Sequence, residues 1–466
     1  MTGVRTRTAG VVLTAAACAA VLSTTSTFTS GLRTLMAEVG LVDNFGFIMG
    51  GTGNPIPDSN YLSSVENLYL NQLPLTYDYK PLETPEQFCP IECSSPGQLP
   101  LTFGQSVNTG VTDLHGAADQ LLGNPLNNIS VLGYSQSATV ASQWMNELIA
   151  NNQSNLNDLH VTLLGDPNSA IGGILDRFQF PDGVGAFSLS PEPQHVPFLD
   201  IPLSLDPTPT SGIATDIFTG EYDGWANFPL DPSNLWADLN ALIGIETVHP
   251  YYPDPDPGVN LDTTNMIDLG TIGNSNFWAI PAPLPALAFL YDGGPAGHFF
   301  YDAFSPFATL IDDWGYGNPG DPGAGIPVEG PGGVMIDPIG VAGPWQVDAT
   351  GQLMASGVDG FIPKMDPLQM LAGVEHAATQ TILGPINDLL QDFGRPELPG
   401  TFLDVVSGYD FTNHLDASLL TAWMDLTASL PNLAPDAILD GSPLISGQPL
   451  IDLVGYGFDI FNFFGA

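Results

Sequence analysis

A serine in a short glycine-containing pentapeptide is the residue of this chain best suited to nucleophilic chemistry. Ser135 lies in Gly133-Tyr134-Ser135-Gln136-Ser137, a variant of G-x-S-x-G with serine at the last position. In a glycine-rich chain such a match is expected about once by chance, so its context must carry the interpretation. A β-prone run, 129–132, enters the pentapeptide and a run of small residues, 138–148, leaves it, as a nucleophile elbow requires. We predict that Ser135 is a nucleophile, with a helix-capping serine as the alternative.

A serine hydroxyl attacks poorly unless a base takes its proton and a carboxylate orients that base. When the nucleophile lies on a strand-turn-helix elbow, the chain order is serine, acid, histidine. Asp223 is the strongest candidate for the acid, because it follows a short β-like run and lies in a loop. Three other acids compete with it: Glu221, Asp231 and Asp238.

The base must follow the acid in the chain, and His249 is the first histidine after Asp223. It comes after a helix-like run, 234–243, and directly precedes Pro250, which favours a loop position. A surface histidine is the alternative for this residue. Three more histidines follow Asp223, namely His298, His376 and His414, and three precede it, namely His115, His160 and His195.

A glycine-rich turn offers donors for the oxyanion that forms when an ester is attacked. A buried strand expected at 42–49 runs into Gly50-Gly51-Thr52-Gly53, where backbone amides become available. We predict an oxyanion hole that combines the Gln136 amide with an amide or hydroxyl of Gly51 and Thr52. A phosphate-binding loop is disfavoured, since the lysine of a P-loop does not follow.

The elements that must position these residues alternate between strands and helices, which predicts an α/β fold with a mainly parallel sheet flanked by helices. The expected strands are 42–49, 129–132 and 160–164, and the expected helices are 61–69, 106–122, 138–148 and 234–243. A Pro- and aromatic-rich stretch, 178–210, is typical of a lid or substrate wall. We place the catalytic domain at 45–320 and a Gly/Pro-rich C-terminal extension of unknown role, with a helical patch at 367–382, at 331–466.

The charge of the chain excludes one large class of partner. The 466 residues carry 7 Lys and Arg against 50 Asp and Glu, a formal net charge of -43 at pH 7. Phosphate neutralisation needs clustered basic side chains, so we expect no nucleic-acid partner. An anionic membrane surface would repel the folded body, and any membrane association must therefore come from an apolar segment.

The first thirty residues supply such a segment. Arg5 and Arg7 precede the apolar run 9–22 and a polar Ser/Thr stretch, as in a secretory signal. A run of this length is short for a bilayer span of about 20 residues, which favours a cleaved signal peptide over a retained membrane segment at 1–30. Lipidation of Cys18 is disfavoured by the three alanines before it. We expect the protein to be secreted or attached to the cell envelope.

Two further cysteines, Cys89 and Cys93, lie four residues apart. Outside the cytoplasm a local disulfide is the expected state of such a pair. A metal site would need more cysteine or histidine nearby. We therefore expect neither a metal nor another cofactor.

Five ordered motifs resemble the PE-PPE domain family of actinobacterial envelope proteins over about residues 45–320. They are Phe47-Ile48-Met49-Gly50-Gly51-Thr52-Gly53-Asn54-Pro55, the Ser135 pentapeptide, Gly165-Asp166-Pro167-Asn168, Tyr222-Asp223-Gly224-Trp225 and Val248-His249. The resemblance implies a cutinase-like or lipase-like α/β-hydrolase acting on acyl esters, with Ser135, Asp223 and His249 matching the triad. The Gly-Tyr-Ser-Gln order also resembles cutinases, in which a hydroxyl residue matching Thr52 helps to bind the oxyanion.

The chain departs from the family pattern in lacking an N-terminal PE or PPE module and in carrying Asn227, the two cysteines and a long tail. Our leading hypothesis is an exported serine esterase or lipase that forms an acyl-enzyme on acyl-ester, lipid-type substrates. The export segment is similar to that of members that transfer acyl groups between glycolipids, so acyl transfer onto trehalose-type glycolipids is an alternative. A catalytically inactive envelope-binding protein on the same scaffold is the third hypothesis.

Overall fold

The computed structural model describes residues 43–93, 99–169, 172–177, 200–202, 207–229, 234–257, 259–291, 293–316 and 367–396, together with 195–196, 328–329, 335–336 and 398. The predicted export segment, most of the expected lid at 178–210 and most of the C-terminal extension lie outside these residues.

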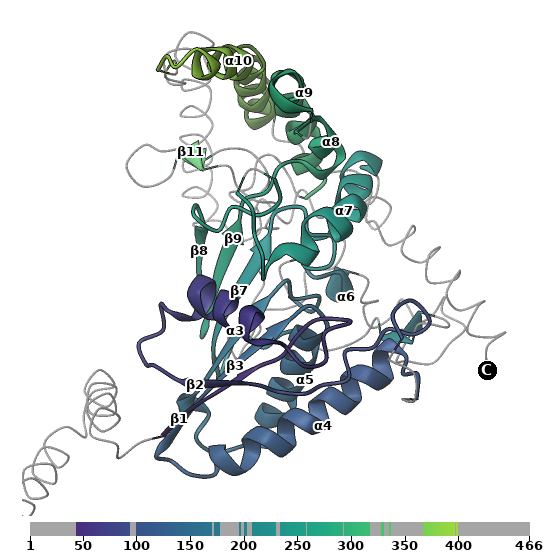
Figure 1. Cartoon of the computed structure of the whole chain (residues 1–466), viewed down its shortest axis with the longest axis vertical. Helices are drawn as coiled ribbons and strands as arrows, with labels where there is room; N and C mark the ends of the chain where they lie inside the picture. Colours follow the sequence, from purple (N-terminus) through teal and green to yellow (C-terminus); the bar gives the residue numbers. More distant parts are fainter. Residues whose placement is uncertain are drawn as a thin grey trace, which may run out of the picture.

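A seven-stranded sheet forms the centre of the described chain, in the order β2-β1-β3-β4-β7-β9-β8 (Figure 1). All neighbouring strands are parallel except the edge pair β8 and β9, which is antiparallel. The strands are β1 (Asp43–Ile48), β2 (Asp78–Pro81), β3 (Asn127–Tyr134), β4 (Leu159–Leu164), β7 (Ala214–Gly220), β8 (Ile267–Ile272) and β9 (Ser275–Ile280). Two two-stranded pairs lie apart from this sheet: β5 (His195–Val196) with β6 (Ile201–Pro202), and β10 (Val328–Glu329) with β11 (Met335–Ile336). The mainly parallel sheet agrees with the alternation of strands and helices in the sequence.

The central strand β3 is buried on both faces, so its side chains divide between two cores. Ile129 and Val131 belong to the core that also contains residues of helices α4 (Phe103–Leu122) and α5 (Gln136–Ala150). Leu132 and Tyr134 belong to the opposite core, with Val65, Tyr69 and Tyr252. Because side chains alternate along a strand, two helices on one side and the chain around residue 65 on the other sandwich the sheet.

Helix α4 begins where its sequence satisfies the backbone donors of the first turn. The Thr102 hydroxyl accepts from the Gln105 amide N–H, and the Gln105 side chain accepts from the Thr102 N–H, a capping box. The remaining helices are α3 (Ser59–Val65), α6 (Ile174–Arg177), α7 (Leu235–Thr247), α8 (Ala288–Tyr291), α9 (Gly294–Trp314) and α10 (Pro367–Asp392). A single π-turn, Glu66–Leu70, continues α3, and short 3-10 turns occupy Leu156–Asp158, His249–Tyr251 and Pro285–Leu287.

Several elements of this architecture were absent from the sequence prediction, among them β2, the hairpin of β8 and β9, and helix α9. The hairpin of β8 and β9 turns through Gly273 and Asn274, and Gly273 takes the positive φ of 59° that such a turn requires. Helix α9 contains glycine and proline, which weaken a helical pattern. Helix α10, within the predicted C-terminal extension, packs against α9 through Ala377 and Leu310, and Figure 1 shows this pair at the far end of the molecule from α4.

Among the described helices, none combines the length and apolar character needed to cross a membrane.

Candidate active site

Ser135 lies at the junction of β3 and α5, in a backbone conformation that an L-residue rarely adopts. Its φ is 58° and its ψ is -120°, and Gln136 is the first residue of the helix. The backbone N–H of Ser135 donates to Leu164 O on β4 at 3.0 Å. Ser137, two residues on, closes the turn because its hydroxyl accepts from the Tyr134 N–H at 2.8 Å. The sharp turn leaves the Ser135 hydroxyl at the carboxyl edge of the sheet, above the start of a helix.

His249 reaches Ser135 from the segment that follows α7. Its Nε2 lies 2.7 Å from Ser135 Oγ, within hydrogen-bonding distance. The ring is buried and lies against Tyr134, whose hydroxyl donates to the His249 carbonyl at 2.7 Å. We expected a loop position, whereas His249 begins a 3-10 turn, which Pro250 supports because it needs no N–H in a first turn.

Asp223 follows β7 and holds the other side of the imidazole. Both of its carboxylate oxygens lie close to His249 Nδ1, at 2.9 and 2.8 Å, and the side chain is fully buried. Two more donors complete its surroundings, the Trp225 backbone N–H at 3.0 Å and the Tyr252 hydroxyl at 2.8 Å. A carboxylate held in this way fixes the tautomer and orientation of the histidine, as the base of a triad requires.

Tyr252 is a site residue that the sequence analysis missed. Its hydroxyl donates to Asp223 and accepts from the Gly220 N–H at 2.6 Å, so it ties the acid to the end of β7. Burial, with the nearby charge of Asp223, raises the pKa of Tyr252 well above its usual value, and the hydroxyl therefore keeps its proton. A tyrosine three residues after the candidate base was the signal available in the sequence.

Gly165, at the end of β4, makes room for the acid and the base. It adopts a positive φ of 56°, and a Cβ there would lie 3.0 Å from His249 Cε1 and 3.2 Å from Asp223 Oδ2. The glycine of the Gly165-Asp166-Pro167-Asn168 motif is therefore explained by close approach as well as by backbone conformation.

The predicted oxyanion residues lie on the other side of Ser135. A Cβ on Gly51 would be 3.2 Å from Ser135 Cβ, so the glycine turn passes directly beside the serine. The Gln136 side-chain Nε2 donates to Thr52 Oγ1 at 3.3 Å. The backbone N–H of Gln136 lies in the first turn of α5, where helix donors have no intrahelical acceptor. The glycine turn and the start of α5 thus flank Ser135, and the role of these groups as oxyanion donors stays a prediction.

The competing acids and histidines lie elsewhere. Glu221 accepts from the Ala282 N–H, and Asp238 lies in the first turn of α7. His160 contacts Asp216, and His115 contacts Asp119 and Glu147. His298 lies on α9 and His376 on α10, and the side chains of Asp231, His195 and His414 fall outside the described residues. Among the described histidines, His249 is the one hydrogen-bonded to Ser135.

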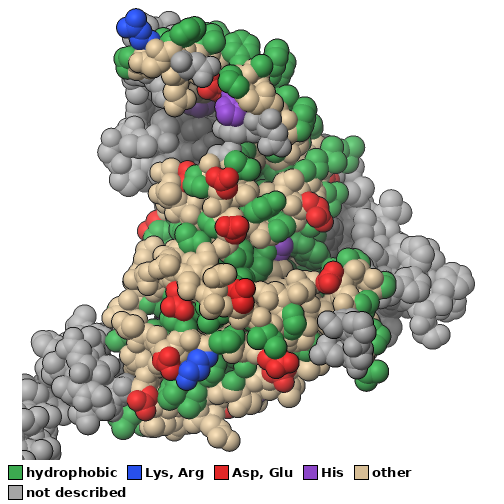
Figure 2. All heavy atoms as spheres, viewed as in Figure 1, with side chains coloured by type: hydrophobic (Ala, Val, Ile, Leu, Met, Phe, Trp, Pro, Cys, Tyr) green, Lys and Arg blue, Asp and Glu red, His purple; other side chains and the backbone are tan. Residues whose placement is uncertain are grey.

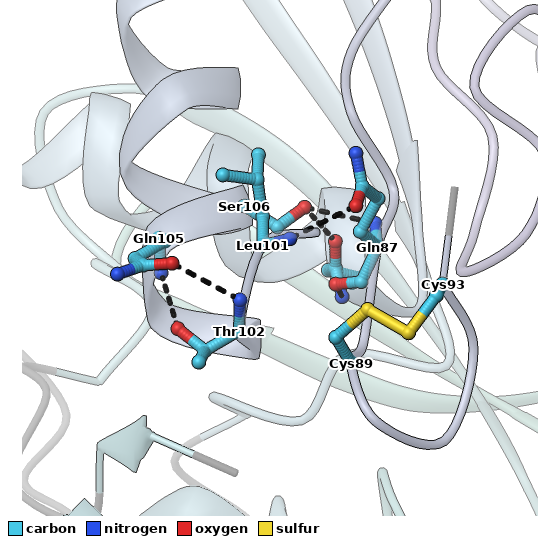
Figure 3. Close-up of a disulfide and its surroundings, with 8 residues drawn as sticks. Gln87, Cys89, Cys93, Leu101, Thr102, Gln105 and Ser106 are labelled. Atoms are coloured by element: carbon cyan, nitrogen blue, oxygen red, sulfur yellow. Dashed lines mark hydrogen bonds between the residues drawn. A yellow bond between two sulfur atoms is a disulfide. The ribbon is translucent and has the colours of Figure 1, made fainter. Parts of the chain in front are cut away.

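A segment from Thr84 to Cys93 supports the glycine turn, and sequence analysis singled out only its cysteines. The Glu86 carbonyl accepts from the Gly53 N–H at 2.8 Å, and the Gln87 carbonyl accepts from Gln136 Nε2 at 2.9 Å. Cys89 and Cys93 form a disulfide across a tight turn directly after Gln87, as Figure 3 shows. The turn that carries Thr52 is thus anchored to a hairpin closed by a covalent bond.

Glu86 is a buried carboxyl group within this support. The Thr84 hydroxyl donates to its Oε1 at 2.7 Å, and its Oε2 has no hydrogen-bond partner among the described residues. Burial raises the pKa of Glu86 to about 8, so the group binds a proton at neutral pH.

The described residues contain no group of three or more His, Cys, Asp or Glu side chains that could hold a metal ion.

The strand order, the elbow between β3 and α5, and an acid after β7 with a later histidine define an α/β-hydrolase fold. The family model of the PE-PPE domain matches residues 75–317, more than half of the chain, and the chain belongs to that family. The matched range includes Ser135, Asp223 and His249, and it begins after the glycine turn.

Curated relatives come from Mycobacterium tuberculosis. PE family protein PE3 is 31% identical over 280 residues, which cover 58% of this chain and 54% of PE3. Esterase PE16 is 37% identical over 220 residues, 46% of this chain and 38% of PE16. The chain thus spans about half or less of the length of these relatives. Among solved structures, a cutinase-like protein from Cryptococcus sp. is similar over 29% of this chain and 63% of its own, at 18% identity and a TM-score of 0.20.

Proposed function

We propose that this protein is a serine esterase that hydrolyses acyl esters of lipid type through an acyl-enzyme on Ser135. The observation that carries the proposal is the continuous contact from Ser135 Oγ through both ring nitrogens of His249 to Asp223. Membership of the PE-PPE family and the similarity to a protein named Esterase PE16 support it.

In the first half-reaction His249 Nε2 takes the proton of Ser135 as Oγ forms a bond to the ester carbonyl carbon. The carbonyl π electrons move onto oxygen, and the Gln136 N–H and the Thr52 hydroxyl donate to the resulting oxyanion. Asp223 stabilises the imidazolium without taking its proton. The oxyanion then collapses, the bond to the alcohol oxygen breaks, and His249 gives its proton to that oxygen.

In the second half-reaction water loses a proton to His249 as its oxygen bonds to the acyl carbonyl carbon. The resulting oxyanion collapses, the bond to Ser135 Oγ breaks, and His249 returns the proton to Oγ, which releases the carboxylic acid and restores Ser135. A sugar hydroxyl in place of water would give acyl transfer with the same groups in the same roles. The contacts of the triad therefore support the formation of an acyl-enzyme, and the choice of water as the second nucleophile is a separate part of the proposal.

Export is a further part of the proposal, and the sequence of residues 1–30 supports it. Two arginines, a short apolar run and a polar exit are typical of a secretory signal. A reporter fused after residue 30 should leave the cytoplasm of an actinobacterial host, and replacing the apolar run 9–22 with polar residues should retain it inside.

Turnover of p-nitrophenyl butyrate by the purified chain tests the enzymatic proposal. We expect release of nitrophenol that falls to background in Ser135→Ala, together with covalent labelling of the wild type but not the variant by a fluorophosphonate. Ser130→Ala is a matched control, because it removes another buried hydroxyl of β3, one that contacts Tyr79 and lies outside the proton path, and it should keep the label. Equal turnover and labelling in the wild type and Ser135→Ala would exclude the proposal, and a wild type that does neither would favour an inactive scaffold.

A further inference from the structure

Thr52 can donate its hydroxyl proton to an oxyanion only if that proton is not used elsewhere. A threonine hydroxyl carries one hydrogen and two lone pairs. Its observed partner is the Gln136 side-chain amide, which contacts Thr52 Oγ1 at 3.3 Å. If the amide presents its NH₂ group, Thr52 accepts and keeps its proton for the substrate. If it presents its carbonyl oxygen, Thr52 donates to it and is lost as an oxyanion donor.

The Gln87 backbone and the Ser106 hydroxyl together decide which way this amide faces. The Gln87 carbonyl can only accept, and it lies 2.9 Å from Gln136 Nε2, so that end must be the NH₂ group. The Gln87 N–H can only donate, and it donates to Ser106 Oγ at 2.9 Å. Ser106 therefore has its own hydrogen available, and it donates to Gln136 Oε1 at 2.7 Å.

These hydrogen bonds link Ser106, Gln87, Gln136 and Thr52 into a network that we call the relay. Ser106, Gln87 and Gln136 are all at least nine-tenths buried, and the amide nitrogen and oxygen of Gln136 both have hydrogen-bond partners. The Gln87 backbone fixes the polarity, because its carbonyl can only accept and its N–H can only donate. Gln87 is itself held by the Leu101 N–H, which donates to its side-chain oxygen at 3.0 Å, close to the Cys89–Cys93 disulfide (Figure 3). A flipped amide would turn its oxygen towards the Gln87 carbonyl and leave buried polar atoms unpaired, which disfavours that state.

We propose that Ser106 is a positioning residue for the reaction at Ser135, because with the Gln87 carbonyl it holds the orientation of the Gln136 amide and so leaves the Thr52 proton free for the oxyanion. Ser106 lies on α4, thirty residues before Gln136, and it acts through Gln136 rather than on the substrate. This proposal rests on the proposed acylation of Ser135.

The test is a double-mutant cycle on Thr52 and Ser106, measured as kcat and KM for p-nitrophenyl butyrate. Thr52→Val should lower kcat by about 10²-fold, the usual size of one oxyanion donor, and Thr52→Ser should retain most activity. Ser106→Ala should lower kcat by about tenfold with little change in KM, because the relay acts in the transition state. In the Thr52→Val background the same change should lower kcat less than twofold, since no proton is left to orient.

Ser130→Ala is the matched control for the cycle, because Ser130 is also a fully buried serine and its hydroxyl contacts Tyr79 rather than the relay. It should change kcat less than twofold in either background. If Ser106→Ala does not fold, Gln136→Met replaces it, since the change removes the amide and keeps the backbone N–H. It should show the same non-additivity with Thr52→Val.

Two results would overturn the proposal: an unchanged kcat in Ser106→Ala, or a loss by the same factor with and without the Thr52 hydroxyl, as a merely structural role predicts. Both results count only if the wild type turns over the ester faster than Ser135→Ala does. If these two proteins have equal turnover, the proposed esterase function is rejected, and this outcome is distinct from a failure of the proposal for Ser106.

Discussion

The catalytic edge of the sheet and the α9–α10 pair are held by different kinds of contact. At the edge, each polar atom of Asp223, His249 and Tyr252 named above has a partner at 2.6–2.9 Å, and the elements meet through directed hydrogen bonds. Helices α9 and α10 meet through apolar side chains such as Leu310 and Ala377. Outside that contact they expose large apolar side chains at helical spacing, among them Phe300, Phe304 and Ile311 on α9 and Ile382, Ile386 and Leu389 on α10.

Figure 2 shows one face of the surface, where acidic side chains are scattered over the body and apolar side chains are frequent at the end that carries α9 and α10. Directed hydrogen bonds specify the position of individual atoms, whereas apolar packing tolerates change as long as volume and pattern are kept. We therefore expect substitutions at the edge to change kcat, and substitutions in the helix pair to change stability alone.

The largest expected effect is that of Asp223→Asn. An amide in place of the carboxylate no longer orients His249 as the base, and kcat should fall by about 10⁴-fold while the fold is kept. Ester turnover and far-UV circular dichroism measure the two quantities. Asp216→Asn is a matched control, since Asp216 also pairs with a histidine, His160, at 2.9 Å but away from Ser135. A comparable loss of kcat in Asp216→Asn would mean that the Asp223–His249 contact matters for folding and not for chemistry.

Tyr252→Phe should have an intermediate effect on both activity and stability. It removes one donor to Asp223 and leaves the Gly220 N–H without its partner, so we expect a kcat about tenfold lower and a stability loss of about 1–3 kcal/mol. Steady-state kinetics and urea unfolding measure these changes. Tyr69→Phe serves for comparison, because the buried Tyr69 hydroxyl donates to the Tyr252 carbonyl at 2.9 Å and not to the acid. It should lose stability without losing kcat.

Glu86→Gln should change how stability depends on pH. The pKa of Glu86 is raised from 4.5 to about 8, so between these values the native chain holds a proton that the unfolded chain has released. This contribution to stability is fully present below about pH 4.5 and is lost as the pH rises through about 8. Glutamine imitates the protonated form, and Tm should exceed that of the wild type by several degrees at pH 9 and by much less at pH 5. Glu83 is exposed, so Glu83→Gln should change Tm by the same small amount at pH 5 and at pH 9. A change in Tm that is equally independent of pH in Glu86→Gln would contradict the raised pKa of Glu86.

The smallest effect is expected in the helix pair. Burial and the neighbouring Asp388 raise the pKa of Asp302 to about 6, so its contribution to stability is lost as the pH rises through about 6. Asp302→Asn should therefore raise Tm slightly at pH 8 relative to pH 5 and leave kcat unchanged. Differential scanning calorimetry and ester turnover measure both, with the exposed Glu246→Gln as the control. A fall in kcat would show that the two regions are coupled.

Much of the fold was predictable because several strands and helices have clear local signals in the sequence. The β-prone runs that became β1, β3 and β4 and the apolar spacing of α4 are local signals, and the mainly parallel sheet follows from their alternation. The order of Ser135, Asp223 and His249 follows from the elbow motif together with the family resemblance. The structure brings these three side chains together, and their catalytic role stays a prediction.

The rest depends on contacts between residues distant in the chain. Gln87 and Ser106 carry no motif, and their importance arises only where they meet Gln136, about thirty to fifty residues away. The hairpin of β8 and β9 lies at the edge of the sheet, where half-exposed strands mix polar and apolar residues. Helix α9 contains Pro306 and four exposed large apolar side chains, and packing rather than propensity determines it.

The conformation of Ser135 has a consequence for the evolution of the chain. A positive φ at a residue with a Cβ costs about 1–3 kcal/mol, a sizeable part of the stability of a domain. Selection for stability alone would place glycine at position 135, which relieves the strain and removes the hydroxyl. The elbow is thus a position where the most stable sequence and the reactive sequence differ, and the surrounding core of β3 and α5 must stabilise the fold enough to tolerate it.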